Sequence, residues 1–316
     1  MRLLFFISVD TIGRLNDMSE RYTFSVIGGD CRQLAIIKEL IQGGHRVKVF
    51  SLGVPTEGIV GAEIASSLDK AVSGADVILL PLPTSRDGKS VNLTSSSENI
   101  KLEDVFHAIS KCEHRLIIGG LISDEIINNA LSYGIDMIDY YKSEDLQQKN
   151  ALPSAEGAIM VAMENTDSVL EGMNVLVCGY GRIGKILASK LKLLGASVSV
   201  AARKDAALCE IAMSGFSPID SRKINQLTDA SKEANVIFNT VPNLIFTRQI
   251  IENIDVDTLY IEIASSPGGI DLQSARSHGM RIIFAPSLPG KYAPASAGEY
   301  IFETIKDILD KRGMNI

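Results

Sequence analysis

Three glycines in the second half of the chain have the spacing of a nucleotide-binding turn. They are Gly179, Gly181 and Gly184 in the segment CGYGRIG, between an apolar run and an amphipathic run. In such turns the first glycine permits a tight bend, the second lets the backbone approach a pyrophosphate, and the third lets helix and strand pack closely. The alternative is a packing turn without a ligand. We predict a dinucleotide site formed by Gly179, Tyr180, Gly181, Arg182, Ile183 and Gly184.

The segment VSVAARK, which ends the next predicted strand, indicates which dinucleotide is bound. NAD-binding turns usually carry an acid about twenty residues after the glycines, where it holds the ribose hydroxyls. Here Ala202, Arg203 and Lys204 occupy that region. Two cations without an acid suit a 2′-phosphate, so the expected cofactor is NADP, with NAD as the alternative. The competing interpretation is that Arg203 and Lys204 are a solvated strand end.

Two later loops should lie against the nicotinamide half of the cofactor. They are NTVP at 239–242 and EIASSPGG at 262–269, and each follows a predicted strand. The alternative for each loop is a Pro/Gly turn with no ligand. The cofactor contacts predicted from these loops are Thr240, Val241, Pro242, Ala264 and Ser265.

An earlier turn, VIGGDCRQ, has a similar outline but lacks the third glycine. It places Asp30 where a phosphate would sit, and a carboxylate repels phosphate there. Asp30 and Gln33 have the spacing of a capping box. In the functional interpretation, Asp30 and Arg32 project into a cleft, where Arg32 pairs with a substrate carboxylate. The first unit is therefore predicted to be a substrate or scaffold domain.

Further substrate contacts are expected from a long polar segment and from the middle of the chain. The segment 83–101 is either a substrate loop, with Arg86 and Lys89 as carboxylate partners, or a disordered insert. Ser154 is predicted to cap a bridging helix and to bind substrate. Glu156, expected in the first turn of that helix, is the candidate general base or substrate-orienting residue. The alternative role of Glu156 is to complement the helix dipole.

Strand patterns alternate with helical patterns along the chain. Strands are predicted at Tyr22–Ile27, Arg46–Ser51, Asp76–Leu82, His114–Gly119, Ile135–Asp139, Asn174–Cys178, Ser197–Ala201, Val236–Thr240, Thr258–Ile263 and Arg281–Phe284. Helices are predicted at Arg32–Gln42, Leu102–Ser110, Asp124–Ser132, Arg182–Leu194, Asp205–Met213, Arg248–Asn253, Asp271–His278 and Ala297–Lys311. This alternation predicts an α/β fold with two doubly wound parallel-sheet domains, the second a Rossmann dinucleotide-binding domain.

The segment KNALPSAEGAIMVAMENTDSVLEGMN marks the boundary between the two domains. We predict a flavodoxin-like or Rossmann-like substrate domain at 21–152. A Rossmann NADP-binding domain should follow at 153–292, starting with the bridging helix at 153–167. The C-terminal segment 293–316 should pack back toward the first domain as a helix. Residues 1–20 are interpreted as a leader or alternative start outside the fold.

Composition argues against several classes of function. The 316 residues carry a net charge of −7, no Trp and 6% aromatic residues, which argues against a nucleic-acid surface. Four cysteines and four histidines show no metal-binding or redox spacing, so no metal site is expected and the thiols are read as free in a reducing cytoplasm. No apolar run reaches the length of a membrane span, so no membrane partner is expected.

Several motifs together resemble the family of dipicolinate synthase A-subunits, from about Tyr22 to the C-terminus. In order they are VIGGDCRQ, PSAEGAI, GYGRIGK, NTVP, ASSPGGID and LPGKYAPASAG. The resemblance implies oxidation of dihydrodipicolinate to dipicolinate with a nicotinamide cofactor, in the mother-cell cytoplasm of a sporulating bacterium. It also implies that the partner is the flavoprotein-like B-subunit of dipicolinate synthase, and a homo-oligomer is expected. The overall plan resembles the two-domain hydroxyacid and alanine dehydrogenases as well.

Two other functions remain open at this point. One is a different NADP-dependent dehydrogenase of a small carboxylate, and the other is a non-catalytic subunit that senses the nucleotide. Plain 2-hydroxyacid oxidation is disfavoured, because it needs a histidine paired with an acid. The four histidines, at positions 45, 107, 114 and 278, all fall in or beside predicted helices and strands rather than in cleft loops.

Overall fold

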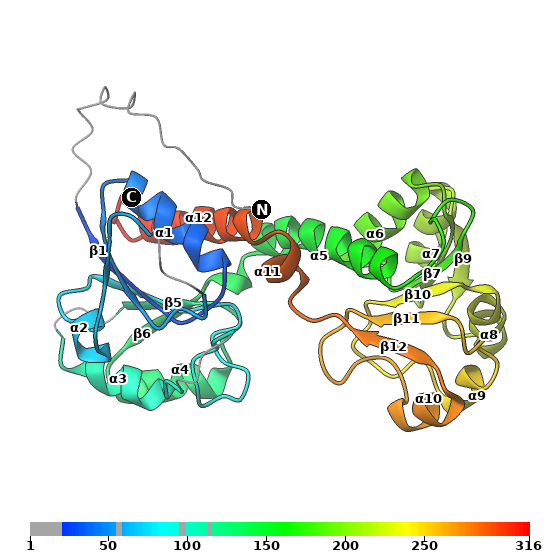
Figure 1. Ribbon diagram of the computed structural model, residues 1–316, viewed down its shortest axis with the longest axis horizontal. Helices are drawn as coiled ribbons and strands as arrows, with labels where there is room; N and C mark the ends of the chain where they lie inside the picture. Colours follow the sequence, from blue (N-terminus) through cyan, green and yellow to red (C-terminus); the bar gives the residue numbers. More distant parts are fainter. Residues whose placement is uncertain (1–20, 55–58, 95–98, 113–115) are drawn as a thin grey trace.

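The computed structural model contains two halves, each built on its own parallel sheet (Figure 1). It describes residues 21–54, 59–94, 99–112 and 116–316. The expected leader or alternative start at 1–20 lies outside the described residues. Two parallel sheets covered by helices confirm the predicted fold class.

The first sheet has six parallel strands in the order β3-β2-β1-β4-β5-β6. The strands are β1 (Thr23–Ile27), β2 (Arg46–Phe50), β3 (Ala62–Ile64), β4 (Val77–Leu79), β5 (Leu116–Gly119) and β6 (Asp136–Asp139). Short apolar runs such as VIL in β4 are buried on both faces, as expected of a parallel sheet between helices. The order is that of a Rossmann sheet, so the flavodoxin-like alternative for this half is excluded.

Helices cover both faces of the first sheet, and one of them comes from the far end of the chain. They are α1 (Arg32–Gln42), α2 (Leu68–Val72), α3 (Leu102–Ser110), α4 (Asp124–Ser132), the 3-10 helix η1 (Tyr140–Lys142) and α12 (Pro294–Asp310). Helix α12 lies beside α1 (Figure 1). Its Ile301, Ile305 and Leu309 share one apolar core with Phe24 of β1 and Ile37 of α1.

The second sheet repeats the same topology, in the order β12-β11-β10-β7-β8-β9. Its strands are β7 (Asn174–Cys178), β8 (Ser197–Ala202), β9 (Ser217–Asp220), β10 (Val236–Asn239), β11 (Leu259–Glu262) and β12 (Arg281–Phe284). Its helices are α6 (Arg182–Leu193), α7 (Asp205–Met213), α8 (Ile224–Glu233), α9 (Arg248–Ile251) and α10 (Leu272–His278). Counted from β7, the order again matches a Rossmann sheet.

The chain passes between the halves twice, through α5 (Glu144–Glu164) and back through α11 (Leu288–Tyr292). The prediction that the bridging helix spans 153–167 is wrong. The helix begins nine residues earlier, because the Ser143 hydroxyl accepts a hydrogen bond from the Leu146 amide and caps it. Pro153 lies inside the helix, where its missing N–H removes one helical hydrogen bond without ending the helix. Within the described part of the chain, no helix has the length and apolar character needed to cross a membrane.

Candidate functional site

The glycine turn after β7 has the shape that a pyrophosphate requires. Gly179 has a φ of +101°, and a Cβ there would collide with the Thr240 hydroxyl. A Cβ on Gly184 would collide with the Gly179 carbonyl, so the helix can approach the strand this closely only with glycine. By contrast, a Cβ on Gly181 would meet no atom within 4 Å. The backbone at Gly181 therefore borders open space, where a ligand can approach it.

The start of helix α6 brings no acidic side chain to the glycine turn. Helix α6 has Gly181 as its N-cap, no side-chain cap and no acid in its first turn, so its amide groups and dipole are available to an anion. Tyr180 is half-buried under the Lys185 ammonium, which lies 5.1 Å from the ring centre. Arg182 is exposed, whereas Ile183 packs against the core. The residues of the turn remain predicted cofactor contacts.

Arg203 and Lys204 follow β8 and are both exposed. Beside them lies a cation that sequence reasoning missed. Arg222 donates to the buried Asp220 from Nε at 2.8 Å and also pairs with Asp205. Asp205 is the first residue of α7 and directly follows Lys204. The adenosine end of the predicted site therefore carries three cations and two acids, with the acids held by Arg222.

The loops after β10 and β11 are joined by a buried carboxylate. Glu262 and Asn239 are the last residues of the two strands, and both are buried. The Asn239 amide donates to Glu262 Oε1 at 2.7 Å and to the Val241 carbonyl at 2.9 Å. Val241 and Ala264 are half-buried, while Pro242 and Ser265 are exposed. Neither Glu262 nor Asn239 was among the predicted site residues, although a polar residue ending an apolar strand was a visible signal.

The glycine turn of the first sheet is closed to a phosphate. The amide of Gly29 donates to the Asn92 carbonyl at 3.0 Å, and the amide of Gly28 donates to the Phe50 carbonyl at 3.1 Å. The residues 91–93 lie so close that a Cβ on Gly28 would meet Val91 at 2.6 Å. Residues 91–93 of the 83–101 segment therefore pack on this turn. Asn92 is another residue that the sequence did not identify.

The capping box expected from Asp30 and Gln33 is not formed. Asp30 Oδ1 accepts from the Arg32 amide at 3.0 Å instead, while the Gln33 side-chain nitrogen is buried without a hydrogen-bond partner. The reason is the neighbouring guanidinium, because Arg32 Nε and Nη2 donate to the two Asp30 oxygens at 2.9 and 2.7 Å. A two-point contact to a cation is stronger than one neutral cap bond.

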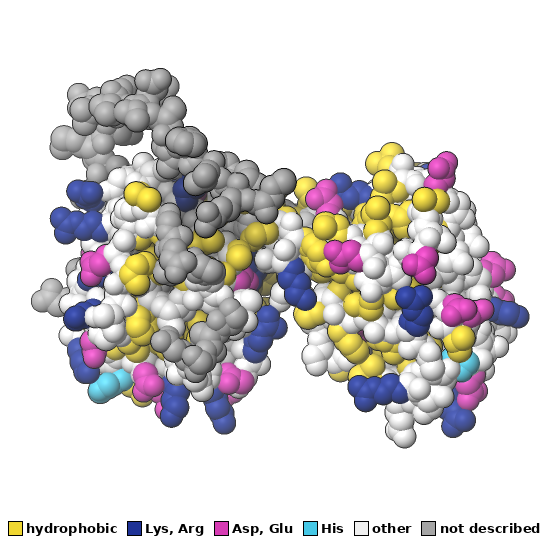
Figure 2. Space-filling view, viewed as in Figure 1, with side chains coloured by type: hydrophobic (Ala, Val, Ile, Leu, Met, Phe, Trp, Pro, Cys, Tyr) yellow, Lys and Arg dark blue, Asp and Glu magenta, His cyan; other side chains and the backbone are white. Residues whose placement is uncertain are grey.

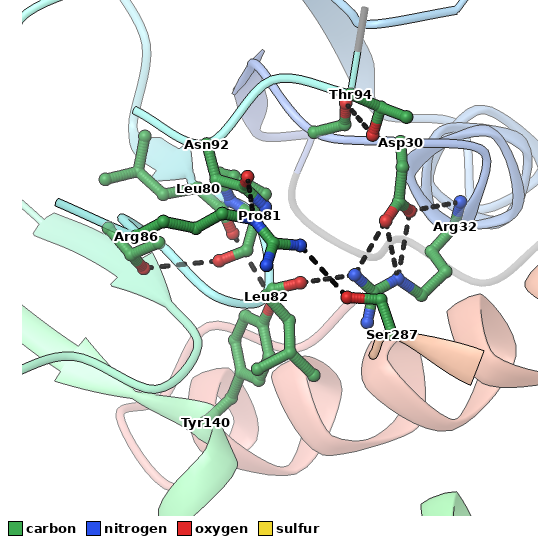
Figure 3. Close-up of polar contacts among 12 residues, drawn as sticks. Asp30, Arg32, Leu80, Pro81, Leu82, Arg86, Asn92, Thr94, Tyr140 and Ser287 are labelled. Carbon is green, nitrogen blue, oxygen red and sulfur yellow. Dashed lines mark hydrogen bonds and ion pairs between the residues drawn. The ribbon is translucent and has the colours of Figure 1, made fainter. Parts of the chain in front are cut away.

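The Asp30–Arg32 pair lies beside the connection between the halves (Figure 3). Arg32 also donates to the Leu82 carbonyl, and its side chain is only 5% exposed. Arg86 donates from Nε to Asn92 Oδ1 at 2.9 Å and from Nη2 to the hydroxyl of Ser287 at 3.0 Å. Ser287 immediately precedes α11, so Arg86 contacts the return connection. Two guanidinium groups are thus held near each other at the edge of the first sheet, and Lys89 is exposed on the same loop.

The space between the halves is open on one side. Figure 2 shows two masses with an indentation between them, and Lys and Arg side chains on the flank of the first half face it. A separate hollow of about 730 Å³ lies at the start of β7, β8 and β9, at the opposite edge of the second sheet from the glycine turn. Ligands of such sheets bind beyond the carboxyl ends of the strands. We therefore place the site at the indentation.

Two predicted substrate residues lie elsewhere than expected. Ser154 is not an N-cap, because it lies inside α5, is buried and donates from its hydroxyl to the Asn150 carbonyl at 2.8 Å. Glu156 is not in a first turn; it lies in the middle of α5 and pairs with Lys190 of α6 at 2.8 Å. Both corrections follow from the earlier start of the helix. In the described residues, no group of three or more His, Cys, Asp or Glu could hold a metal ion.

Two family models match the two halves of the chain separately. Residues 23–141 match the family model for the N-terminal domain of the dipicolinate synthase A-subunit. Residues 154–285 match "S-adenosyl-L-homocysteine hydrolase, NAD binding domain". The second half is therefore an NAD-binding type of domain, which supports a nicotinamide dinucleotide as cofactor.

Whole-chain relatives agree with these matches. The chain is 30% identical to the dipicolinate synthase A-subunit of Bacillus subtilis over 285 residues, which is 90% of this chain and 95% of that protein. A crystal structure of the Bacillus halodurans A-subunit superposes with a TM-score of 0.79 at 30% identity, over 92% of this chain and 98% of that one. The Bacillus subtilis A-chain structure gives 0.76 at 29% identity, over 92% and 96%.

Proposed function

The chain belongs to the family of dipicolinate synthase A-subunits, and we propose that it oxidises dihydrodipicolinate to dipicolinate with NADP as the hydride acceptor. The single observation that carries the proposal is the contrast between the two glycine turns. One turn has open space at Gly181 and no acid in the following helical turn. The other is filled by the Asn92 carbonyl and carries Asp30. This contrast supports a cofactor on the second half and a substrate on the first.

The substrate, a dicarboxylate, calls for cations at the facing edge of the first sheet. Arg86 is exposed there, and Arg32 lies beside it with a guanidinium oriented by Asp30. In our proposal Arg86 and Lys89 bind one carboxylate directly, because a solvated cation can exchange its present partner for a ligand. Arg32 keeps its contact with Asp30 and does not bind the carboxylate directly. Its positive charge, next to Arg86, adds to the attraction for the carboxylate. Ser154 and Glu156 remain weaker candidates, because Ser154 is buried inside α5 and Glu156 is an acid already paired with Lys190.

The oxidation of a dihydropyridine needs little acid–base catalysis. A dihydropyridine loses one hydride and one proton as its ring becomes aromatic, and aromatisation supplies the driving force. When bound, the nicotinamide would supply the hydride acceptor. The residues of this chain then have to hold the ring over that acceptor and exclude other orientations, which is a positioning role for the two carboxylate-binding cations.

Further parts of the proposal follow from family membership. We infer that the chain acts with the B-subunit of dipicolinate synthase, that it forms a homo-oligomer, and that it works in the mother-cell cytoplasm during sporulation. The flavoprotein-like character of the B-subunit is part of this inference.

A coupled assay tests the proposal. Dihydrodipicolinate is mixed with NADP⁺ or NAD⁺ and the purified protein, with and without the B-subunit, while reduced cofactor and dipicolinate are measured. Equal amounts of the two products are expected, and Gly181→Asp should form neither. Turnover of other small carboxylates alone would favour a different dehydrogenase. Tight cofactor binding without turnover, even when the B-subunit is present, would favour a nucleotide-sensing role.

A further inference from the structure

Glu262 is a buried acid at the carboxyl edge of the second sheet, with an exposed fraction of 3%. Its Oε1 accepts from the Asn239 amide at 2.7 Å and from the Ala264 amide at 3.2 Å. Its Oε2 accepts from the Gly269 amide at 2.8 Å and from the Tyr260 hydroxyl at 3.0 Å. The side chain therefore receives four hydrogen bonds from the two loops predicted to contact the cofactor and from its own strand.

The contacts of Glu262 are those that suit a carboxylate. Three of the four groups around Glu262 are N–H groups that can only donate, and the Tyr260 hydroxyl is oriented as the fourth donor, which favours the carboxylate form. The orientation of Asn239 is fixed independently, because its Oδ1 accepts from the Val241 amide at 3.1 Å while its nitrogen faces Glu262. The four donors are neutral, so they satisfy the oxygens without supplying a positive charge.

Neighbouring groups respond to this charge. Burial, and then the charge of Glu262, raise the pKa of the Cys178 thiol at the end of β7. The same two causes, in the same order, raise the pKa of the Tyr260 hydroxyl. The field of Glu262 therefore reaches the strand that leads into the glycine turn.

The sheet order relates this charge to the cofactor. The glycine turn follows β7, and β10 and β11 lie successively to one side of it, while β8 and β9 lie to the other. A dinucleotide bound across such a sheet has its adenosine half over one side and its nicotinamide half over the other. Since Arg203 and Lys204 mark the β8 side as the adenosine end, the nicotinamide belongs above β10 and β11, where Glu262 ends its strand.

We propose that Glu262 is a specificity-determining residue that makes the site prefer the oxidised cofactor over the reduced one. The oxidised nicotinamide ring carries a positive charge, which the carboxylate attracts, and the reduced ring is neutral. The proposal rests on the proposed function, because it requires a nicotinamide in this half. Its consequence for turnover is that the reduced cofactor, once formed, leaves more readily.

The expected effect is modest but measurable. A nicotinamide above β10 and β11 would lie within about two strand spacings of Glu262, or roughly 10 Å. At that range a unit charge in protein surroundings changes the affinity for another unit charge by about tenfold. Removing the charge should therefore weaken binding of NADP⁺ several-fold to about tenfold and leave that of NADPH almost unchanged.

The test compares dissociation constants for NADP⁺ and NADPH, with NAD⁺ and NADH in parallel, in the full chain. Glu262→Gln removes the charge at nearly constant size. Tyr260→Phe is the matched control, because it removes one of the four donors and keeps the charge. We expect Glu262→Gln to shift the ratio of the two constants several-fold, and Tyr260→Phe to leave it within about twofold of the parent value.

A parallel loss of both affinities in Glu262→Gln, or an unchanged ratio, would overturn the inference and reduce Glu262 to a structural role. If Glu262→Gln does not fold, the parent protein decides the question. Binding NADP⁺ at least as tightly as NADPH supports the inference, and a preference for NADPH overturns it. A parent protein with the expected ratio but no dihydrodipicolinate oxidation would refute the proposed substrate and leave this inference intact.

Discussion

Arg182 holds Glu144 through two hydrogen bonds, from Nε at 2.9 Å and from Nη2 at 2.7 Å. Arg182 opens α6 beside the predicted phosphate site, and Glu144 opens the helix that bridges the two halves. Hydrogen bonds from Arg182 and Gln148 lower the pKa of Glu144 to about 2, so the acid is charged at neutral pH. A bound pyrophosphate and Glu144 would therefore compete for one guanidinium.

Glu144→Gln should tighten cofactor binding. The substitution removes the competing charge and frees Arg182 for the phosphates. Exposed ion pairs are weak, so we expect a gain of about two- to threefold in affinity, measured by titration. Glu252→Gln is the matched control, because it breaks the exposed Arg248–Glu252 pair on α9. Equal or weaker affinity in Glu144→Gln would show that Arg182 does not reach the cofactor.

Gly181→Asp should abolish cofactor binding without unfolding the protein. A Cβ at this position meets no atom within 4 Å, and the φ of −89° suits any residue. The new carboxylate would face the pyrophosphate and repel it. Thermal unfolding should match that of the parent protein, while affinity should fall at least a hundredfold. Normal binding by a folded Gly181→Asp variant would place the cofactor elsewhere.

Arg203→Ala should reduce the preference for NADP over NAD. A charged hydrogen bond contributes about 1.5–3 kcal/mol, but solvent at this exposed position weakens it, so about a tenfold loss is expected. The change should appear in the NADP dissociation constant, with NAD binding unaltered. Equal affinity of the parent protein for both cofactors would contradict the assignment. An unchanged ratio in Arg203→Ala would mean that this cation is only a solvated strand end.

Arg32→Ala should destabilise the protein by about 3 kcal/mol, because it leaves the mostly buried Asp30 carboxylate without its cation. The free energy of unfolding can be measured with urea. Arg248→Ala removes an arginine from an ion pair that is exposed on both sides, and should change stability by less than about 0.5 kcal/mol. Similar effects of the two substitutions would show that the Asp30–Arg32 pair contributes no more than a surface pair.

Acid should selectively weaken the contact of Asp30 with Arg32. Burial alone would raise the pKa of Asp30, but the hydrogen bonds and charge of Arg32 outweigh it and hold the pKa below its usual 3.8. The stabilisation is therefore complete above about pH 4 and is lost as pH falls through the lowered pKa. Asp30→Asn should show a flatter decline of unfolding free energy below pH 4. A parallel decline in both proteins would assign the acid sensitivity to other groups.

Local patterns predicted the regular elements well. Helices α1, α3, α4 and α7 begin and end at the predicted residues. The helices α2 and α8 and the short edge strands β3 and β9 were missed. Strands of three or four residues without a continuous apolar run carry little periodicity. The start of α5 was misread because Pro153–Ser154 resembles a helix start. Ser143, ten residues earlier, caps the helix instead.

The site was harder to predict than the fold. The glycine spacing at 179–184 is local and therefore readable from the sequence. In contrast, Asn92 closes the first glycine turn from more than sixty positions away, and Arg86 reaches Ser287 across 201 positions. Glu262 and Asn239 meet only because β10 and β11 are neighbours in the sheet. Such pairs depend on topology, which periodicity does not encode.

The position of α12 has a consequence for synthesis on the ribosome. The first sheet is translated early, yet its core includes Ile301, Ile305 and Leu309 near the end of the chain. The second sheet, by contrast, is continuous in sequence from β7 to β12. We expect the second half to reach its native form first during synthesis. Part of the apolar surface of the first half stays uncovered until α12 has been translated. The order of maturation is then the reverse of the order of translation.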